Sequence, residues 1–130
     1  MERELLSTFT VAGPEVDNLT YGQNVTFTAV VTNANTTGAP TGSVSFYDAS
    51  SGATCSALGT STLIGTDSAA DSTTSTTSTW TTSTTTLAVG SHTILACYNA
   101  TGDFTNSSNT TTQTVNKANA TVSEIGRAHV

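Results

Sequence analysis

The feature that most constrains the fold is a two-residue alternation of apolar and polar side chains. Residues 24–32 read NVTFTAVVT, with apolar side chains at every second position: Val25, Phe27, Ala29 and Val31. Successive side chains of a β-strand point to opposite faces of a sheet, so this spacing predicts a strand with one buried face. No segment repeats apolar residues at helical spacing. The same reasoning predicts further strands over residues 7–11, 42–48, 92–98 and 110–115.

The composition agrees with an all-β chain. Serine and threonine occupy 47 of the 130 positions, while only 9% of the residues are charged. Threonine is β-branched and fits the pleated surface of a sheet, whereas a disordered polyelectrolyte would need a high net charge. Turn signals rich in glycine recur between the predicted strands. Short strands separated in this way are typical of a β-sandwich or barrel.

One segment, residues 72–86, could be either a stalk or a strand. It reads STTSTTSTWTTSTTT and contains the only tryptophan, Trp80. A buried aromatic side chain removes about 150–250 Å² from water, which a mucin-like stalk would not use. We therefore expect a strand over residues 78–86, anchored by Trp80 and Leu87, and a loop or frayed edge over residues 66–77. An exposed Trp80 would instead offer a surface on which a sugar ring could stack.

The residues expected to form the core are apolar and share the inward parity of these strands. They are Val25, Phe27, Val31, Val44, Phe46, Trp80, Leu87, Ile94 and Tyr98. His92 has the parity of Ile94, so we expect a core histidine bonded to nearby backbone rather than a general base.

The sequence predicts neither an enzyme nor a cofactor site. Two cysteines and one histidine in the body of the chain fall short of the four ligands of a structural zinc site. No G-x-S-x-G motif is present, and no nucleophile, base and acid can be assembled. The segment GTDSAAD resembles an acidic loop but lacks the ligand density of a calcium site. A weak surface contact with calcium at Asp67, Asp71 or Asp103 is the alternative left open.

Charge and cysteine content bear on partners and compartment. Between Ser7 and Val122 there are six acidic residues and one basic residue, Lys117. Nucleic acid and anionic membranes are therefore poor partners. No apolar run approaches the roughly 18 residues of a membrane span. The first residues do not resemble a signal peptide, so export would depend on an upstream segment.

Two features nevertheless favour an extracellular setting. Seven Asn-x-Ser/Thr sequons are candidate glycosylation sites. They begin at Asn18, Asn24, Asn35, Asn99, Asn106, Asn109 and Asn119. In an exported protein, Cys55 and Cys97 would be expected to form a disulfide, since Cys55 follows the 42–48 strand and Cys97 lies in its predicted neighbour. Two unpaired cysteines are the alternative.

Five segments occur in the order seen in a known family. LTYGQNVTFTAVV, PTGSVSFYD, LGTSTL, LAVGSHTILACY and TQTVNKA resemble the bacterial Ig-like domains that are repeated in large surface proteins. The resemblance covers about residues 8–118 and implies a seven-stranded immunoglobulin-like β-sandwich. It also implies a non-catalytic structural or spacer module of an extracellular adhesin-type protein, with neighbouring Ig-like modules as partners.

This chain departs from the family pattern in three places. Cys97 stands at an outward position usually held by threonine, and residues 51–63 and 98–104 form longer connections than usual. These departures motivate a second hypothesis. The chain would be a module that binds a surface glycan or a protein ligand through loops 48–57 and 98–108.

The expected domain organisation is a single module with short ends. Residues 1–6 are expected to be disordered, residues 7–118 to form the sandwich, and residues 119–130 to lead towards a further module. The last seven residues, EIGRAHV, resemble the translation of a common sequencing adapter. We therefore expect the natural sequence to have been cut near Ser123, which reading the source DNA would test.

Overall fold

The computed structural model describes residues 7–12, 19–33 and 37–122. The ends and connections predicted at 1–6 and beyond 122 therefore lie outside the described residues. Within the described ranges the chain forms eight strands and no helix, and accordingly no helix that could cross a membrane. The strands are β1 (Ser7–Ala12), β2 (Val25–Asn33), β3 (Gly42–Ala49), β4 (Thr62–Asp67), β5 (Ser72–Thr73), β6 (Thr77–Thr84), β7 (Gly90–Ala100) and β8 (Ser107–Val115).

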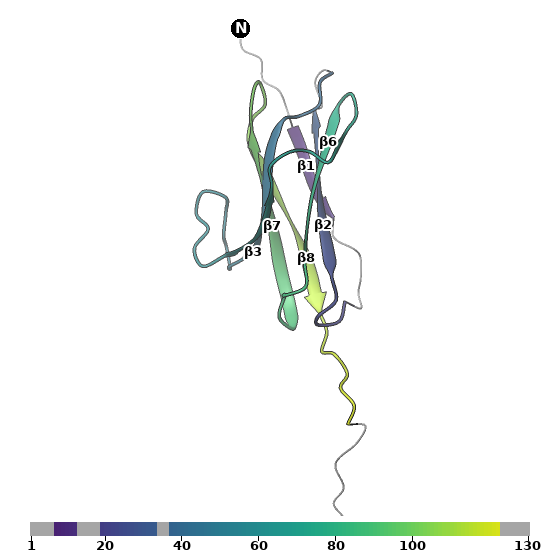
Figure 1. Ribbon diagram of the computed structural model, residues 1–130. Helices are drawn as coiled ribbons and strands as arrows, with labels where there is room; N and C mark the ends of the chain where they lie inside the picture. The colour runs from purple at the N-terminus through teal and green to yellow at the C-terminus, as the bar shows by residue number, and fades with distance from the viewer. Residues whose placement is uncertain (1–6, 13–18, 34–36, 123–130) are drawn as a thin grey trace, which may run out of the picture.

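The strands form two sheets that pack face to face. One sheet has the order β1-β2-β6-β5 and the other β4-β3-β7-β8. Every neighbouring pair is antiparallel. Figure 1 shows the two layers as an elongated sandwich with the strands running along its length. The predicted all-β sandwich of about seven antiparallel strands is confirmed, the eighth strand being the two-residue β5.

The core lies between the two sheets. All nine predicted core residues are buried, none more than 7% exposed: Val25, Phe27, Val31, Val44, Phe46, Trp80, Leu87, Ile94 and Tyr98. The rings of Trp80 and Tyr98 meet with centroids 5.4 Å apart, and this contact joins β6 to β7. Trp80 Nε1 has no hydrogen-bond partner, so the tryptophan stabilises the core through its apolar surface.

Polar groups at one end of the core are paired with backbone. Tyr98 Oη donates to the Thr41 carbonyl at 2.5 Å, and Ser78 Oγ donates to the Pro40 carbonyl at 2.7 Å. Both acceptors precede β3, so these bonds fix the entry of the chain into the second sheet. These two buried hydroxyl groups are tolerated because each has a hydrogen-bond partner.

The two long edges of the sandwich are closed by cross-sheet contacts. On one side Thr20 forms a parallel bridge with Asn116, and Tyr21 N donates to the Asn116 carbonyl at 2.9 Å. On the other side Asp67 Oδ2 accepts a hydrogen bond from Thr81 N at 3.0 Å and so links β4 to β6. Open strand edges template association with other chains, and these contacts limit how much edge is free.

The segment between β4 and β6 differs from its prediction. Residues 66–77 were expected to be a loop or frayed edge, but Thr66 and Asp67 complete β4, and Ser72 and Thr73 form β5. The prediction holds for residues 68–71 and 74–76 and for β5, which is a two-residue strand at the edge of its sheet. It is wrong at the end of β4, where alternation is weak: Leu63 is 53% exposed and Ile64 is only partly buried. β4 is held by pairing with β3, 14 or more residues away, and β5 pairs with β6 across a short turn.

Gly65 lets β4 approach β6 closely. A Cβ at this position would overlap Thr82 Oγ1. We expect Gly65→Ala to lower the free energy of unfolding by about 1–3 kcal/mol, as overpacking does in other cores. In the Gly65→Ala/Thr82→Ala double variant the overlap is absent, so urea denaturation should show a smaller loss than the sum of the single changes. Additive losses would mean that the two strands are not in contact here.

Tyr98 predicts a loss of stability at alkaline pH. Burial raises the pKa of its hydroxyl from 10.0 to about 12, because the phenolate is poorly solvated inside the sandwich. The folded value lies above the unfolded one. The contribution of the protonated Tyr98 to the free energy of unfolding is therefore complete below pH about 10. It is lost as the pH rises towards about 12. Urea denaturation across this range should show a steeper decline for the natural protein than for Tyr98→Phe. Equal slopes would contradict this assignment.

Candidate functional site

The main irregular feature of the sandwich is the β3–β4 loop, residues 50–61. Figure 1 shows this loop standing out to one side of the molecule near β3. Its base is closed by Ser61 Oγ, which accepts a hydrogen bond from Ser50 N at 2.8 Å. Its tip is a tight turn in which Thr54 and Ala57 exchange backbone hydrogen bonds of 3.1 and 3.0 Å. The long connection recognised in the sequence is thus an ordered loop.

A disulfide ties this loop to the second sheet. Cys55 in the loop and Cys97 in β7 are bonded, with their Cα atoms 5.9 Å apart and a sequence separation of 42. The pairing proposed from the sequence is therefore present. Closing a loop of this length removes conformational freedom from the unfolded chain.

The loop is fixed to the outer face of β7 at Cys97. Ile94, Ala96 and Tyr98 face the core, so Leu95 and Cys97, which alternate with them, face outward. Both outward residues are nevertheless buried, at 3% and 5% exposure. The prediction that Cys97 lies outward is correct for its direction, but the sequence did not predict its burial. For Cys97, the partner Cys55 on the β3–β4 loop lies far away in sequence, so parity alone gives no sign of this burial.

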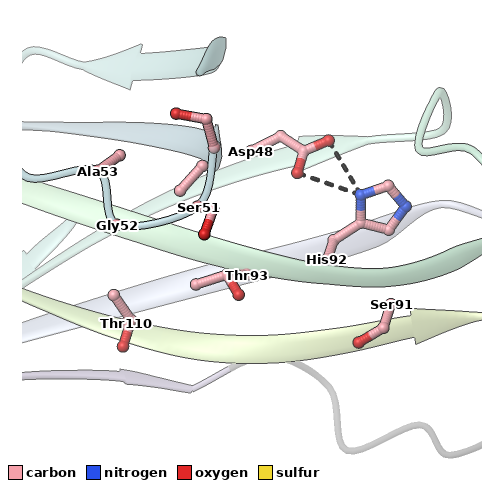
Figure 2. Close-up of a pocket in the computed structure, with 10 residues that line it drawn as sticks. Asp48, Ser51, Gly52, Ala53, Ser91, His92, Thr93 and Thr110 are labelled. Atoms are coloured by element: carbon pink, nitrogen blue, oxygen red, sulfur yellow. Dashed lines mark hydrogen bonds and ion pairs between the residues drawn. The ribbon is translucent and has the colours of Figure 1, made fainter. Parts of the chain in front are cut away.

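On one side of this loop lies a hollow of about 490 Å³, which we call the Asp48 hollow (Figure 2). It lies between the start of the loop and the first residues of β7. Its lining residues are Asp48, Ala49, Ser50, Ser51, Gly52, Ala53, Ser91, His92, Thr93 and Thr110. The lining is dominated by hydroxyl and backbone groups, with one carboxylate and one imidazole.

The side chains of Asp48 and His92 are within hydrogen-bond distance at the rim of this hollow. His92 Nδ1 lies 3.0 and 3.1 Å from the two carboxylate oxygens, as the dashed lines in Figure 2 show. His92 Nε2 lies 2.6 Å from the Ala88 carbonyl. The prediction of a core histidine was wrong, because the imidazole is 14% exposed and paired with a carboxylate. The expected bond to nearby backbone is present. The sequence did not reveal Asp48 as the partner of His92, because the two residues lie 44 positions apart.

This pair resembles part of a catalytic triad but lacks a free base. In a triad the carboxylate binds one ring nitrogen and the other nitrogen receives the proton of a nucleophile. Here the second nitrogen of His92 is taken by the Ala88 carbonyl, which is only an acceptor. The contact therefore ties β3, β7 and the turn before β7 together. Its geometry indicates a structural role.

A second hollow of about 400 Å³ lies on the other side of the loop, and we call it the disulfide hollow. It is lined by Thr54, Cys55, Ser56, Cys97, Tyr98, Asn99, Asn106, Ser107 and Ser108. No charged residue contributes to this lining. Together the two hollows are bounded by parts of loops 48–57 and 98–108, the segments identified in the sequence. Neither hollow presents an exposed aromatic ring, since Tyr98 is 1% exposed.

The acidic residues considered for calcium are bound to protein groups. Thr81 Oγ1 donates a hydrogen bond to Asp71 Oδ2 at 2.7 Å. This bond is the main cause that holds the pKa of Asp71 below its usual value, and an interaction with the Asp67 side chain is the second cause. Asp103 is exposed in the connection after β7. Among the residues that the structure describes, no group of three or more His, Cys, Asp or Glu side chains is placed to hold a metal ion.

The candidate glycosylation sites fall on the surface where they are described. Asn24, Asn99, Asn106, Asn109 and Asn119 are all exposed. Asn106 Oδ1 also accepts a hydrogen bond from Ala100 N at 2.8 Å, which orders the β7–β8 connection. Asn18 and Asn35 lie outside the described residues. Use of these sequons stays a prediction.

The comparison with protein families gives one match. The model described as bacterial Ig-like domain (group 3) matches residues 12–116, well over half of the chain. No curated protein and no solved structure gives a significant match. The matched range runs from the end of β1 to the residue after β8, so the family match and the sandwich coincide. The resemblance found in the sequence is confirmed, and the chain belongs to the bacterial Ig-like domain family, group 3.

Proposed function

We propose that this chain is a non-catalytic spacer module of a larger, repetitive surface protein outside the cell. The observation that carries this proposal is where the first strand begins and the last strand ends. β1 begins at Ser7 at one end of the sandwich, and β8 ends at Val115 at the opposite end (Figure 1). Modules with this polarity can be joined in series, each adding its full length to a stalk.

The strand arrangement suits a chain under tension. β1 is paired with β2 over its whole length, and β8 is paired with β7 over its whole length. A pull on Ser7 and Val115 acts along these two strands rather than across them. All the hydrogen bonds of each strand then resist together, instead of breaking one at a time. The parallel bridge between Thr20 and Asn116 adds to this resistance.

The surface and the disulfide favour an extracellular location. The outward positions of the β2–β6 pair are mostly hydroxyl side chains, such as Thr26, Thr28, Thr81 and Ser83. Such a face stays hydrated without charges, so its solvation does not depend on salt. Disulfides persist in oxidising compartments and are rare in reducing ones, which supports export of the parent protein. Neighbouring Ig-like modules of the same chain are the partners that this role requires.

The sequence of the full parent gene tests this proposal. We expect further Ig-like copies beside this one, an export signal and no catalytic domain that depends on this module. A single copy attached to a cytoplasmic enzyme would contradict the spacer role.

A second candidate function is ligand binding by the two hollows. The observation in its favour is that the long loops seen in the sequence line both of them. Neither hollow contains an exposed aromatic ring, so both lack the usual stacking surface for a sugar. A glycan array would decide between the two functions. Binding that is lost in Thr110→Lys, at the Asp48 hollow, but kept in Thr28→Lys, on the opposite sheet, would support ligand binding. No binding is the result expected for a spacer.

A further inference from the structure

The disulfide lies outside the hydrophobic core and opens to solvent. The core cluster includes neither Cys55 nor Cys97, although both belong to well-ordered segments. Cys55 is exposed, whereas Cys97 is 5% exposed. Both residues line the disulfide hollow of about 400 Å³. A small nucleophile can therefore reach this bond without disturbing the packing between the sheets.

The loop that carries Cys55 is otherwise held by its own hydrogen bonds. Ser50 and Ser61 close its base, Ser50 Oγ donates to the Leu58 carbonyl at 3.1 Å, and Thr54 pairs with Ala57. Each of these bonds joins two members of residues 50–61. The disulfide is thus the only covalent tie between the middle of the loop and β7. Breaking it frees the loop to move while the paired strands keep their hydrogen bonds.

We propose that Cys55–Cys97 is a site of thiol–disulfide exchange that an external dithiol can open in the folded protein. The first thiolate of the dithiol attacks Cys55 Sγ, the more accessible sulfur, and forms a mixed disulfide with it. The Cys55–Cys97 bond breaks, and its electron pair leaves on Cys97 Sγ as a thiolate. The second thiolate of the dithiol then attacks the dithiol sulfur that is bonded to Cys55. Cys55 leaves as a thiolate, and the dithiol is oxidised to a disulfide.

Two consequences follow from this chemistry. Release of the loop frees Cys97, which is 5% exposed while bonded to Cys55, as a thiol on the outer face of β7. It also frees the 42-residue span between the cysteines, which cannot lengthen while the bond is intact. The proposed exchange reaction is argued from the exposure of Cys55 and from the disulfide hollow alone. Only the mechanical use of the freed span rests on the proposed spacer function.

The test compares reduction by dithiothreitol in the native and denatured protein. Exchange in the folded state predicts native and denatured rates of the same order. If reduction required global unfolding, the native rate would be lower by about 10³-fold or more, and that result would overturn the proposal. After native reduction, amide hydrogen exchange should keep β2, β6 and β7 protected and should speed up in residues 53–58. Loss of protection throughout the sheets would also overturn it.

Mapping of the mixed disulfide tests which sulfur is attacked. The natural protein is treated with reduced glutathione, quenched in acid, and analysed by peptide mass spectrometry. The adduct is expected on Cys55, and an adduct on Cys97 would overturn the assignment. The Cys55→Ser/Cys97→Ser variant should take up no glutathione. Exchange observed in a protein whose parent shows no repeats would leave this site in place and contradict only the spacer function.

Discussion

Replacing Trp80 with alanine is expected to lower the free energy of unfolding by about 3–5 kcal/mol, the range for buried aromatic side chains. Trp80 has no exposed surface and lies on β6, between the sheets. Its ring meets Tyr98 of β7, so the change removes a contact that joins the two layers. The cavity left behind would be lined by residues whose backbone is fixed in two sheets, which limits relaxation. Equilibrium denaturation in urea measures the loss.

Two further variants calibrate this measurement. Trp80→Phe keeps an aromatic ring in the site and removes an indole N–H that has no partner, so its loss should be clearly smaller. Val89→Ala changes a side chain that is 45% exposed and should alter stability by less than about 0.5 kcal/mol. A loss below about 1 kcal/mol for Trp80→Ala would contradict its role as a core anchor.

Removal of the disulfide by Cys55→Ser/Cys97→Ser should lower the free energy of unfolding by about 4 kcal/mol in the chain-entropy model. The effect arises in the unfolded state, because the bond closes a loop of 42 residues there. The folded sheets lose little, since neither cysteine belongs to the core cluster. The unfolded chain also becomes more expanded, so the dependence of stability on urea concentration should become steeper.

The control for this prediction is the reduced natural protein. Dithiothreitol should lower its stability to that of the double serine variant and should leave the variant itself unchanged. A variant as stable as the oxidised natural protein would contradict the account of the bond as a constraint on the unfolded chain.

The sequence predicted the parts of this fold that depend on local pattern. Strand β2 follows from the alternation around Phe27, and the inward direction of Trp80 follows from its place among threonines that suit an outer face. Both predictions are confirmed, because one face of each strand is buried and the other is not. The order of motifs then identified the family, which the match over residues 12–116 confirms.

The parts that could not be predicted depend on contacts far apart in sequence. Strand β4 has only a weak apolar pattern around the partly buried Ile64, and it is held by pairing with β3 and by its approach to β6 at Gly65. His92 has the parity of a core residue, but the carboxylate of Asp48 holds it at the rim of a hollow. Cys97 faces outward but is 5% exposed, and its disulfide partner Cys55 lies on the β3–β4 loop. In each case the deciding partner lies on another element, and parity carries no information about it.

The central claim is that this module is a spacer whose extension is limited by its disulfide. The most direct measurement is single-molecule force spectroscopy on the chain, pulled through handles attached beyond Ser7 and Val115, before and after reduction. We expect one cooperative unfolding event in each state. The gain in length should be about 150 Å greater after reduction, since the 42 residues between the cysteines then extend at up to about 3.6 Å each. Equal gains in both states, or extension without a cooperative event, would contradict the account.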